Sequence, residues 1–279
     1  MTLYHYTDQN GFMGIFLNQE LWASKIQYLN DEKEYSLALD LAEAYLKKLI
    51  EKEKNRALRM RLAYYLEITP YIKNQNVCVC SLTENGDLLS QWRGYSRALG
   101  GYSIDFNVFA LESFIRLQGF ELVQCIYDAQ KQEKKIVDMI ETLVSEFSYE
   151  SEPDYKMGPY YESGDIFLDR LAKIAPILKD ASFVEEAEWR ILATVSFEDL
   201  EFRAGKSMLI SYAKINLDYR ENRDFNRLIN EIIVGHTPHP DLAVSATEAF
   251  ILKHFPPLHD DDYQCPINVR KSTIPFRNW

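Results

Sequence analysis

Two carboxylates near the end of the second third of the chain have the spacing of a chemical site. The stretch FVEEAEWRIL (183–192) places Glu186 and Glu188 two residues apart where a strand is predicted to begin. Residues two apart in extended backbone project from one face, and carboxylates sharing a face repel unless a cation or ligand intervenes. Glycosyl chemistry uses such carboxylates to stabilise an electron-poor sugar centre. The alternative is a solvated strand entrance, with Trp189 packing inward and Arg190 pairing outward.

A histidine lies at the very start of the chain. The stretch LYHYT (3–7) reads as a first strand and places His5 between Tyr4 and Tyr6. Histidine changes charge near neutral pH, so it can hydrogen-bond a ligand or move a proton. A lone histidine on a strand is more often a structural residue with satisfied hydrogen bonds than a catalytic one.

A third stretch, SQWRGYSRALGGYSIDF (90–106), combines Trp92, Arg93, Tyr95 and Tyr102 with a glycine pair. Aromatic faces next to an arginine suit a planar heterocycle and a phosphate. They also suit ordinary packing, and the glycines suit a hairpin turn.

Other site signatures are weak or absent. The stretch HTPHPD (236–241) contains His236, His239 and Asp241, and His259 is followed by three aspartates. Its prolines enforce an extended loop, and no helical H-E-x-x-H spacing occurs, so we predict no metal ligands. The sequence also lacks a P-loop, G-x-G-x-x-G and G-x-S-x-G, the usual signatures of NTPases, Rossmann dehydrogenases and hydrolases.

Both kinds of secondary structure must position these residues. Periodicity and capping predict helices at about 11–17, 31–67 (two helices, beginning after Asn30), 88–95, 107–117, 128–147, 163–179 and 245–254. Strands are predicted at about 3–6, 21–24, 76–82, 102–106, 120–127, 188–195, 208–217 and 231–235. The segments 148–162 and 256–266 read as loops, and the first of them could cover a site. The irregular order of strands and helices predicts an α+β protein.

Composition sets the class of protein. The chain has 279 residues, 47% of them hydrophobic, which is ample for a core, and we predict a single α+β domain with a helical insertion at about 31–67. The net charge of −11 argues against a sequence-independent grip on long nucleic acid but leaves a local basic groove possible. Four sparse cysteines, no signal peptide and no apolar run of about 20 residues indicate a soluble cytoplasmic protein without a membrane partner.

Three blocks together resemble a known family. LYHYT…GIFLNQELWAS…LND, then CSLTE…LLSQWRGYS…GGYSIDF, then EEAEWRIL are similar to a bacterial domain-of-unknown-function family, DUF2971. These blocks in turn resemble, more distantly, the ADP-ribosyltransferase superfamily. That resemblance implies a split mixed or antiparallel sheet of ADP-ribosyltransferase type, with helical insertions, that grips NAD in a cleft.

The same resemblance implies roles for individual residues. His5, with its neighbours Tyr6 and Thr7, would bind the cofactor. Glu188 would be the catalytic residue and Glu186 its helper. The nicotinamide pocket would be lined by one of three residues, which the sequence does not separate: Ser24, Tyr95 and Tyr102. Arg93 or Arg190 would meet the pyrophosphate.

The expected reaction is therefore transfer of ADP-ribose from NAD to an unknown acceptor, a protein, a nucleic acid or water, in a bacterial toxin or phage-defence effector. A second class is a metal-dependent nuclease or phosphohydrolase that uses the two glutamates on a divalent cation. A third is a nucleotide-binding module without catalysis. The oligomeric state is not predicted.

Overall fold

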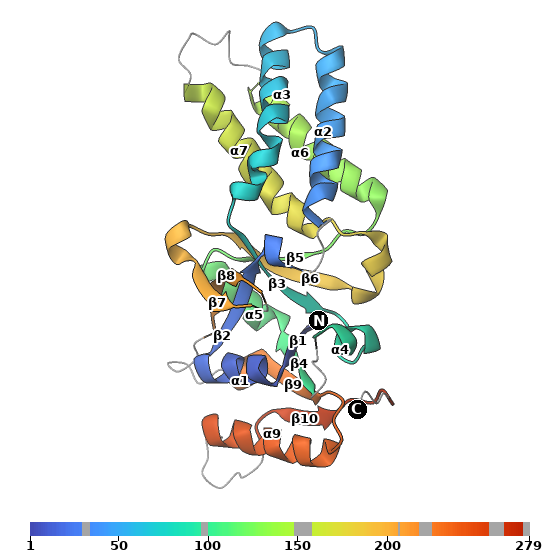
Figure 1. Cartoon of the computed structure of the whole chain (residues 1–279), viewed down its shortest axis with the longest axis vertical. Helices are drawn as coiled ribbons and strands as arrows, with labels where there is room; N and C mark the ends of the chain where they lie inside the picture. Colours follow the sequence, from blue (N-terminus) through green and yellow to red (C-terminus); the bar gives the residue numbers. More distant parts are fainter. Residues whose placement is uncertain are drawn as a thin grey trace.

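A computed structural model describes residues 1–29, 34–95, 100–147, 158–205, 207–217, 225–256 and 265–275 of the protein. The molecule is elongated: a sheet occupies its middle, a group of helices projects from one end, and α9 (Pro240–His254) covers the other end (Figure 1). Asn30, Asp31, Glu32, His259 and most of both predicted loops lie outside the described residues.

The described residues form one 10-stranded sheet. The strands are β1 (Thr2–Asp8), β2 (Glu20–Lys25), β3 (Val77–Thr83), β4 (Gly101–Asn107), β5 (Glu121–Gln124), β6 (Glu188–Thr194), β7 (Glu201–Ala204), β8 (Leu209–Asn216), β9 (Ile229–Val234) and β10 (Asn268–Lys271). The pair β9–β10 is parallel and the other pairs are antiparallel, so the sheet is open and mixed. The α+β class is thereby confirmed.

Strand β3 is the branch point of this sheet. On one side it pairs with β6 along its whole length. On the other side it pairs with β2 at Cys78 and Val79, and with β1 only at Thr83. No described strand pairs with Cys80–Leu82 on that second side, a stretch that we call the gap. The gap separates an arm of β1, β4, β9 and β10 from an arm of β2, β8 and β7.

The helices are α1 (Gln9–Asn18), α2 (Glu34–Lys52), α3 (Arg56–Ile68), α4 (Leu89–Tyr95), α5 (Val108–Leu117), α6 (Ala129–Phe147), α7 (Gly158–Ile174), α8 (Phe225–Leu228) and α9 (Pro240–His254). Short 3₁₀ turns lie at η1 (Ile26–Tyr28), η2 (Thr69–Asn74), η3 (Ala175–Ile177), η4 (Ala181–Glu186) and η5 (Phe197–Asp199). None of the described helices is long and apolar enough to span a bilayer.

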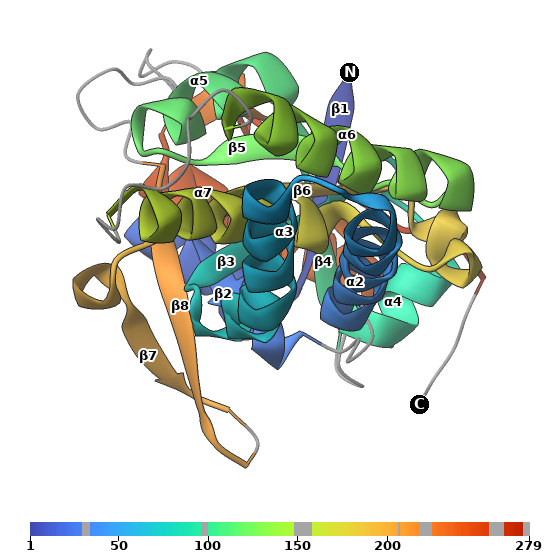
Figure 2. The ribbon, with the colours of Figure 1, turned by 90° about the horizontal axis from the view of Figure 1, so that it is seen from above.

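The helical block predicted at 31–67 contains α2 and α3, but it does not stand alone. Helices α6 and α7 pack against it to form a four-helix bundle above the sheet (Figure 2). Leu46, Leu62, Ile140 and Leu171, one from each helix, are almost fully buried in a common core. Burial of these side chains stabilises the bundle, by roughly 1.5–3 kcal/mol for each fully buried leucine or isoleucine.

The sheet separates two cores because successive side chains of a strand point to opposite faces. On one face, Leu82 and Ile191 join a core with α1 and α5. On the other face, Val79 and Leu192 join the core of the bundle. Helix α4 also covers this second face, where Trp92 packs against Tyr6.

Candidate active site

The two predicted carboxylates do not share a face of one extended strand. Glu186 is the last residue of η4, and Glu188 is the first residue of β6. Between them Ala187 has φ 40° and ψ 51°, a left-handed conformation that costs a residue with a Cβ atom roughly 1–2 kcal/mol. This turn overturns the expectation drawn from extended backbone, and the carboxylates meet for another reason.

That reason is Lys179, which the sequence interpretation missed. Its Nζ lies 2.5 Å from Oε2 of Glu186 and also donates a hydrogen bond to Oε2 of Glu188. The lysine is held by its backbone, since its N–H donates to the carbonyl of Ile126 and its carbonyl accepts from Nε2 of Gln132. Burial by itself lowers the pKa of Lys179, but the two carboxylates outweigh burial and raise it, so the ammonium stays charged.

Arg190 completes a buried ionic network around Glu188. Its Nε donates to Oε1 of Glu188 at 2.9 Å and its Nη2 to Oε2 at 3.2 Å, while Nη1 donates to the carbonyl of Pro176. Burial raises the pKa of Glu188, yet the charges of Arg190 and Lys179 outweigh burial and hold it below the usual range. Arg190 is 1% exposed, so the alternative interpretation in which it pairs outward is wrong.

Glu186 differs from Glu188 in its access to solvent. Its side chain is 23% exposed, against 5% for Glu188. Lys179 engages only Oε2 of Glu186, and Oε1 has no hydrogen-bond partner among the described residues. The cluster therefore presents one fixed carboxylate oxygen outward. Thr83 of β3 fixes the backbone of Glu186, because its hydroxyl donates a hydrogen bond to the carbonyl of Glu186 at 2.5 Å.

Two tyrosines border the acidic pair. Tyr95, at the end of α4, is 40% exposed, and burial together with the charges of Glu188 and Glu186 raises the pKa of its hydroxyl to about 12. The hydroxyl of Tyr127 accepts a hydrogen bond from the backbone N–H of Glu188 at 2.9 Å. Both phenols remain protonated at neutral pH, and Tyr95 lies within electrostatic range of both glutamates.

Tyr6 fixes the loop that leads to α4. Its hydroxyl donates to the carbonyl of Asn85 at 2.8 Å and accepts from the N–H of Leu88 at 2.9 Å. Its ring meets Trp92 edge-on, with 4.8 Å between ring centroids. Tyr6 is 5% exposed, so it supports the element that carries Tyr95 and has little surface to offer a ligand.

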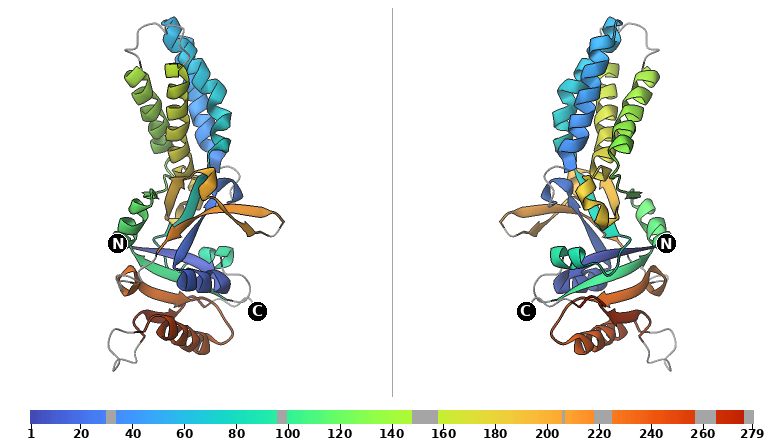
Figure 3. Two further views of the ribbon diagram at one scale, coloured as in Figure 1. Left: turned by 90° about the vertical axis from the view of Figure 1, so that its left-hand side faces the viewer. Right: turned by 90° about the vertical axis from the view of Figure 1, so that its right-hand side faces the viewer.

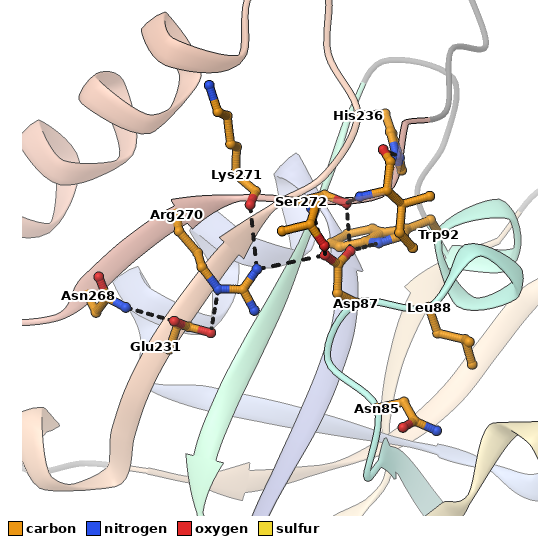
Figure 4. A network of polar contacts seen from close by, with 12 residues as sticks. Asn85, Asp87, Leu88, Trp92, Glu231, His236, Asn268, Arg270, Lys271 and Ser272 are labelled. Carbon is orange, nitrogen blue, oxygen red and sulfur yellow. Dashed lines mark hydrogen bonds and ion pairs between the residues drawn. The ribbon is translucent and has the colours of Figure 1, made fainter.

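Asp87 fastens the same loop to the C-terminal segment (Figure 4). Its carboxylate accepts from Nε1 of Trp92 at 2.8 Å, from the hydroxyl of Ser272 at 2.6 Å and from the N–H of Thr273 at 2.7 Å. Arg270 lies 3.7 Å from the same carboxylate and bonds Glu231 of β9. Burial raises the pKa of Asp87, but these hydrogen bonds outweigh it and keep the group ionised.

His5 lies at the gap. Its Nδ1 is 3.0 Å from the carbonyl oxygen of Ser81, and a carbonyl only accepts, so Nδ1 carries the proton. Burial lowers the pKa of His5, and this hydrogen bond offsets only part of the effect, so the ring is neutral at neutral pH. Nε2 has no hydrogen-bond partner among the described residues.

The strand register separates His5 from the acidic pair. Tyr4 pairs with Thr83, and Thr83 pairs with Glu188, so these three residues share one face of the sheet. His5 points to the opposite face, where its Nδ1 lies 3.8 Å from Sγ of Cys80. The structure thus places the imidazole and the carboxylates on opposite faces of β3, and not together as the resemblance implies.

The other candidates lie in three different places. Ser24, on β2, accepts a hydrogen bond from Nη2 of Arg203 at 3.0 Å. Tyr102, whose strand partner is Thr7, stacks on Phe12 with 4.0 Å between ring centroids. Arg93 is exposed on α4, two residues from Tyr95. Of Ser24, Tyr95 and Tyr102, only Tyr95 borders the acidic pair.

Lys179, Tyr127 and Asp87 could not be singled out from the sequence. Each occupies a turn or loop between regular elements, so periodicity gives no sign of where its side chain points. No group of three or more His, Cys, Asp or Glu side chains within the described ranges is arranged to hold a metal ion. His236, in the HTPHPD stretch that was considered for a metal site, has its Nε2 2.8 Å from the backbone carbonyl oxygen of Ile274.

The fold and the site define an α+β protein with an open, mixed sheet and a charged cluster that exposes one carboxylate. Residues 91–191 match the family model described as "Protein of unknown function (DUF2971)". The matched stretch runs from α4 into β6 and contains Tyr95, Lys179, Glu186 and Glu188. The match supports the family resemblance that the sequence blocks predicted. No curated protein and no solved structure matches the chain.

Proposed function

We propose that this protein cleaves the nicotinamide–ribose bond of NAD and transfers ADP-ribose to an acceptor, in the manner of the ADP-ribosyltransferase superfamily. One observation carries the proposal: Lys179 holds Oε2 of Glu186, Oε1 has no hydrogen-bond partner among the described residues, and the partly exposed Tyr95 lies within electrostatic range of this carboxylate. A carboxylate fixed in this way suits stabilisation of a developing positive charge.

In the proposed reaction the C1′–N bond of the nicotinamide ribose breaks, and nicotinamide leaves with the bonding electron pair. Oε1 of Glu186 accepts the hydrogen bond of the 2′-hydroxyl and stabilises the positive charge that develops on the sugar. The acceptor atom then bonds to C1′ and loses its proton, for which Glu186 is a suitable base. In this proposal Tyr95 stacks on the flat nicotinamide, and Arg93, an exposed residue of α4, binds the pyrophosphate.

This assignment departs from the resemblance in three respects. Both oxygens of Glu188 are taken by Lys179 and Arg190, so Glu186 is the better candidate for direct contact with the substrate. His5 is better suited to positioning, because it holds Ser81 of the strand whose Thr83 bonds Glu186. Arg190 is buried and engaged, which disfavours it for the pyrophosphate.

The same charges disfavour the metal-dependent nuclease. A divalent cation at Glu186 and Glu188 would lie next to the ammonium of Lys179 and the guanidinium of Arg190. These two cations also occupy Oε2 of Glu186 and both oxygens of Glu188, so Oε1 of Glu186 alone is left of the pair for a divalent cation that needs several oxygen ligands.

The test is release of nicotinamide from labelled NAD, with and without protein and nucleic-acid acceptors. Glu186→Gln is expected to lower kcat by about 100-fold or more and to change KM by only a few-fold, because its contact is strongest in the transition state. Glu185→Gln, an exposed neighbour, is the matched control and should retain full activity. Absence of nicotinamide release by the native protein with every acceptor would refute the proposal.

A further inference from the structure

The outer end of the helical bundle is strongly basic, unlike the rest of the chain. Residues 47–61, which we call the basic tip, comprise the end of α2, the connection and the start of α3. They contain seven lysines and arginines and two glutamates, in a chain whose net charge is −11. Figures 1 and 3 show this hairpin end at the extremity of the molecule, away from the sheet.

Most of these cations form no ion pair with the described residues. Lys47 pairs with Glu43 at 3.1 Å, and Lys48 lies 6.0 Å from the ring centre of Tyr45. The other exposed cations are Lys52, Lys54, Arg56 and Arg59, and none of these four forms an ion pair in the part of the chain that the structure describes. All four side chains face solvent.

Helix stability does not account for the arginines. The lysines at the end of α2 complement the negative end of the helix dipole. Arg56 and Arg59 lie in the first turns of α3, where the dipole is positive, and that first turn contains no acidic residue. Cations at this end cost a helix roughly 0.3–1 kcal/mol each, and neighbours three apart also repel each other. The side chain of Asn55 already caps α3 by accepting from the N–H groups of Ala57 and Leu58.

We infer that the basic tip binds the phosphodiester backbone of nucleic acid. A row of unpaired, exposed cations gains most from a partner with regularly spaced negative charges, because each phosphate contact also releases condensed counterions. The acidic remainder of the surface repels such a polyanion, which directs it to the tip. The inference stands independently of the proposed NAD chemistry; if both hold, nucleic acid is the favoured class of acceptor.

Other anionic partners fit the tip less well. Binding at a membrane surface requires an apolar face beside the cations, and Met60, 53% exposed, is the exposed large hydrophobic residue of the tip. Protein interfaces are enriched in aromatic residues and depleted in lysine. Residues 47–61 contain no aromatic residue and four lysines.

The experiment is fluorescence polarisation with labelled DNA and RNA, single-stranded and duplex, across a series of salt concentrations. The test variant is Lys52→Gln/Arg56→Gln/Arg59→Gln in the full chain. Its matched control is Lys73→Gln/Lys131→Gln/Lys253→Gln, which removes the same charge from three exposed positions elsewhere. Thermal unfolding of both variants shows whether each remains folded; we expect the test variant to be at least as stable as the native protein.

We expect the native protein to bind with log K falling linearly with log salt. The test variant should bind at least about tenfold more weakly near 0.1 M salt, with a slope shallower by about 2–3, because each lost phosphate contact removes about 0.7–0.9 from the slope. The control should match the native protein. The inference is overturned if native protein binds no nucleic acid, if both variants lose affinity equally, or if anionic phosphatidylserine vesicles bind the tip and nucleic acid does not.

Discussion

Nζ of Lys179 lies 2.5 Å from Oε2 of Glu186, although Lys179 lies in the connection between η3 and η4, Glu186 ends η4, and neither residue belongs to a strand. The same ammonium bonds Glu188. The charges of Lys179 and Arg190 therefore balance those of two carboxylates that would otherwise repel each other. Because the cluster is buried except at Glu186, its stability and its chemistry can be tested separately.

Removal of Glu188 should destabilise the fold. Glu188→Ala leaves the guanidinium of Arg190 buried without its carboxylate, and breaking a buried ion pair in this way costs about 3–5 kcal/mol. Urea unfolding of native and variant protein measures the difference. Glu112→Gln is the control, because its partner Arg116 is exposed and such pairs contribute about 1 kcal/mol or less. Similar losses in both variants would show that the Glu188 network contributes no more than a surface pair.

The same network should make the free energy of unfolding fall at acid pH. The pKa of Glu188 is depressed in the folded state, so its contribution to stability is present above the unfolded value, about 4.3, and is lost as the pH falls toward the lower folded value. We expect the free energy of unfolding to drop below about pH 4.3 more steeply in native protein than in Glu188→Gln. Parallel pH profiles from pH 7 to 3 would contradict this expectation.

His5 should contribute a second pH dependence of the same sign, at a higher pH than that of Glu188. Its folded pKa lies below the unfolded value of about 6.5, so the unfolded chain binds the proton more readily and stability falls as the pH drops below about 6.5. Thermal unfolding of native protein and His5→Gln between pH 8 and 5 should show a smaller decline in the variant. The remaining histidines are unchanged and cancel in the comparison. An equal decline would mean that His5 titrates normally in the folded protein.

Asp87→Ala should release the C-terminal segment from the loop before α4. The variant loses the hydrogen bonds to Ser272, Thr273 and Trp92, and bonds to a charged group contribute roughly 1.5–3 kcal/mol each. Hydrogen exchange at the amide of Thr273 should become faster, and the free energy of unfolding should fall by at least about 2 kcal/mol. The control Asp241→Ala removes the 87% exposed partner of Lys271 and should leave both quantities unchanged. Unchanged exchange at Thr273 in Asp87→Ala would show that other contacts hold the segment.

Local pattern was sufficient to locate many of the elements. The helix predicted at 107–117 is observed as α5, Val108–Leu117, because Asn107 caps it and apolar residues recur at helical spacing. Predicted strands at 188–195 and 208–217 correspond to β6 and β8. The short strand β7 was not predicted, since four residues at the edge of a sheet show no reliable alternation. Helix α7 begins at Gly158, before the predicted start at Ser163.

The sequence alone determined the α+β class, the order of its elements and the presence of an acidic pair beside a strand, because these depend on neighbouring residues. Only the tertiary structure decided what surrounds that pair. The left-handed conformation of Ala187 determines where the side chains of Glu186 and Glu188 point. The ion pair with Lys179 joins residues of different turns. The strand register places His5 on the opposite face of the sheet. Each depends on contacts between distant segments, and no local periodicity encodes them.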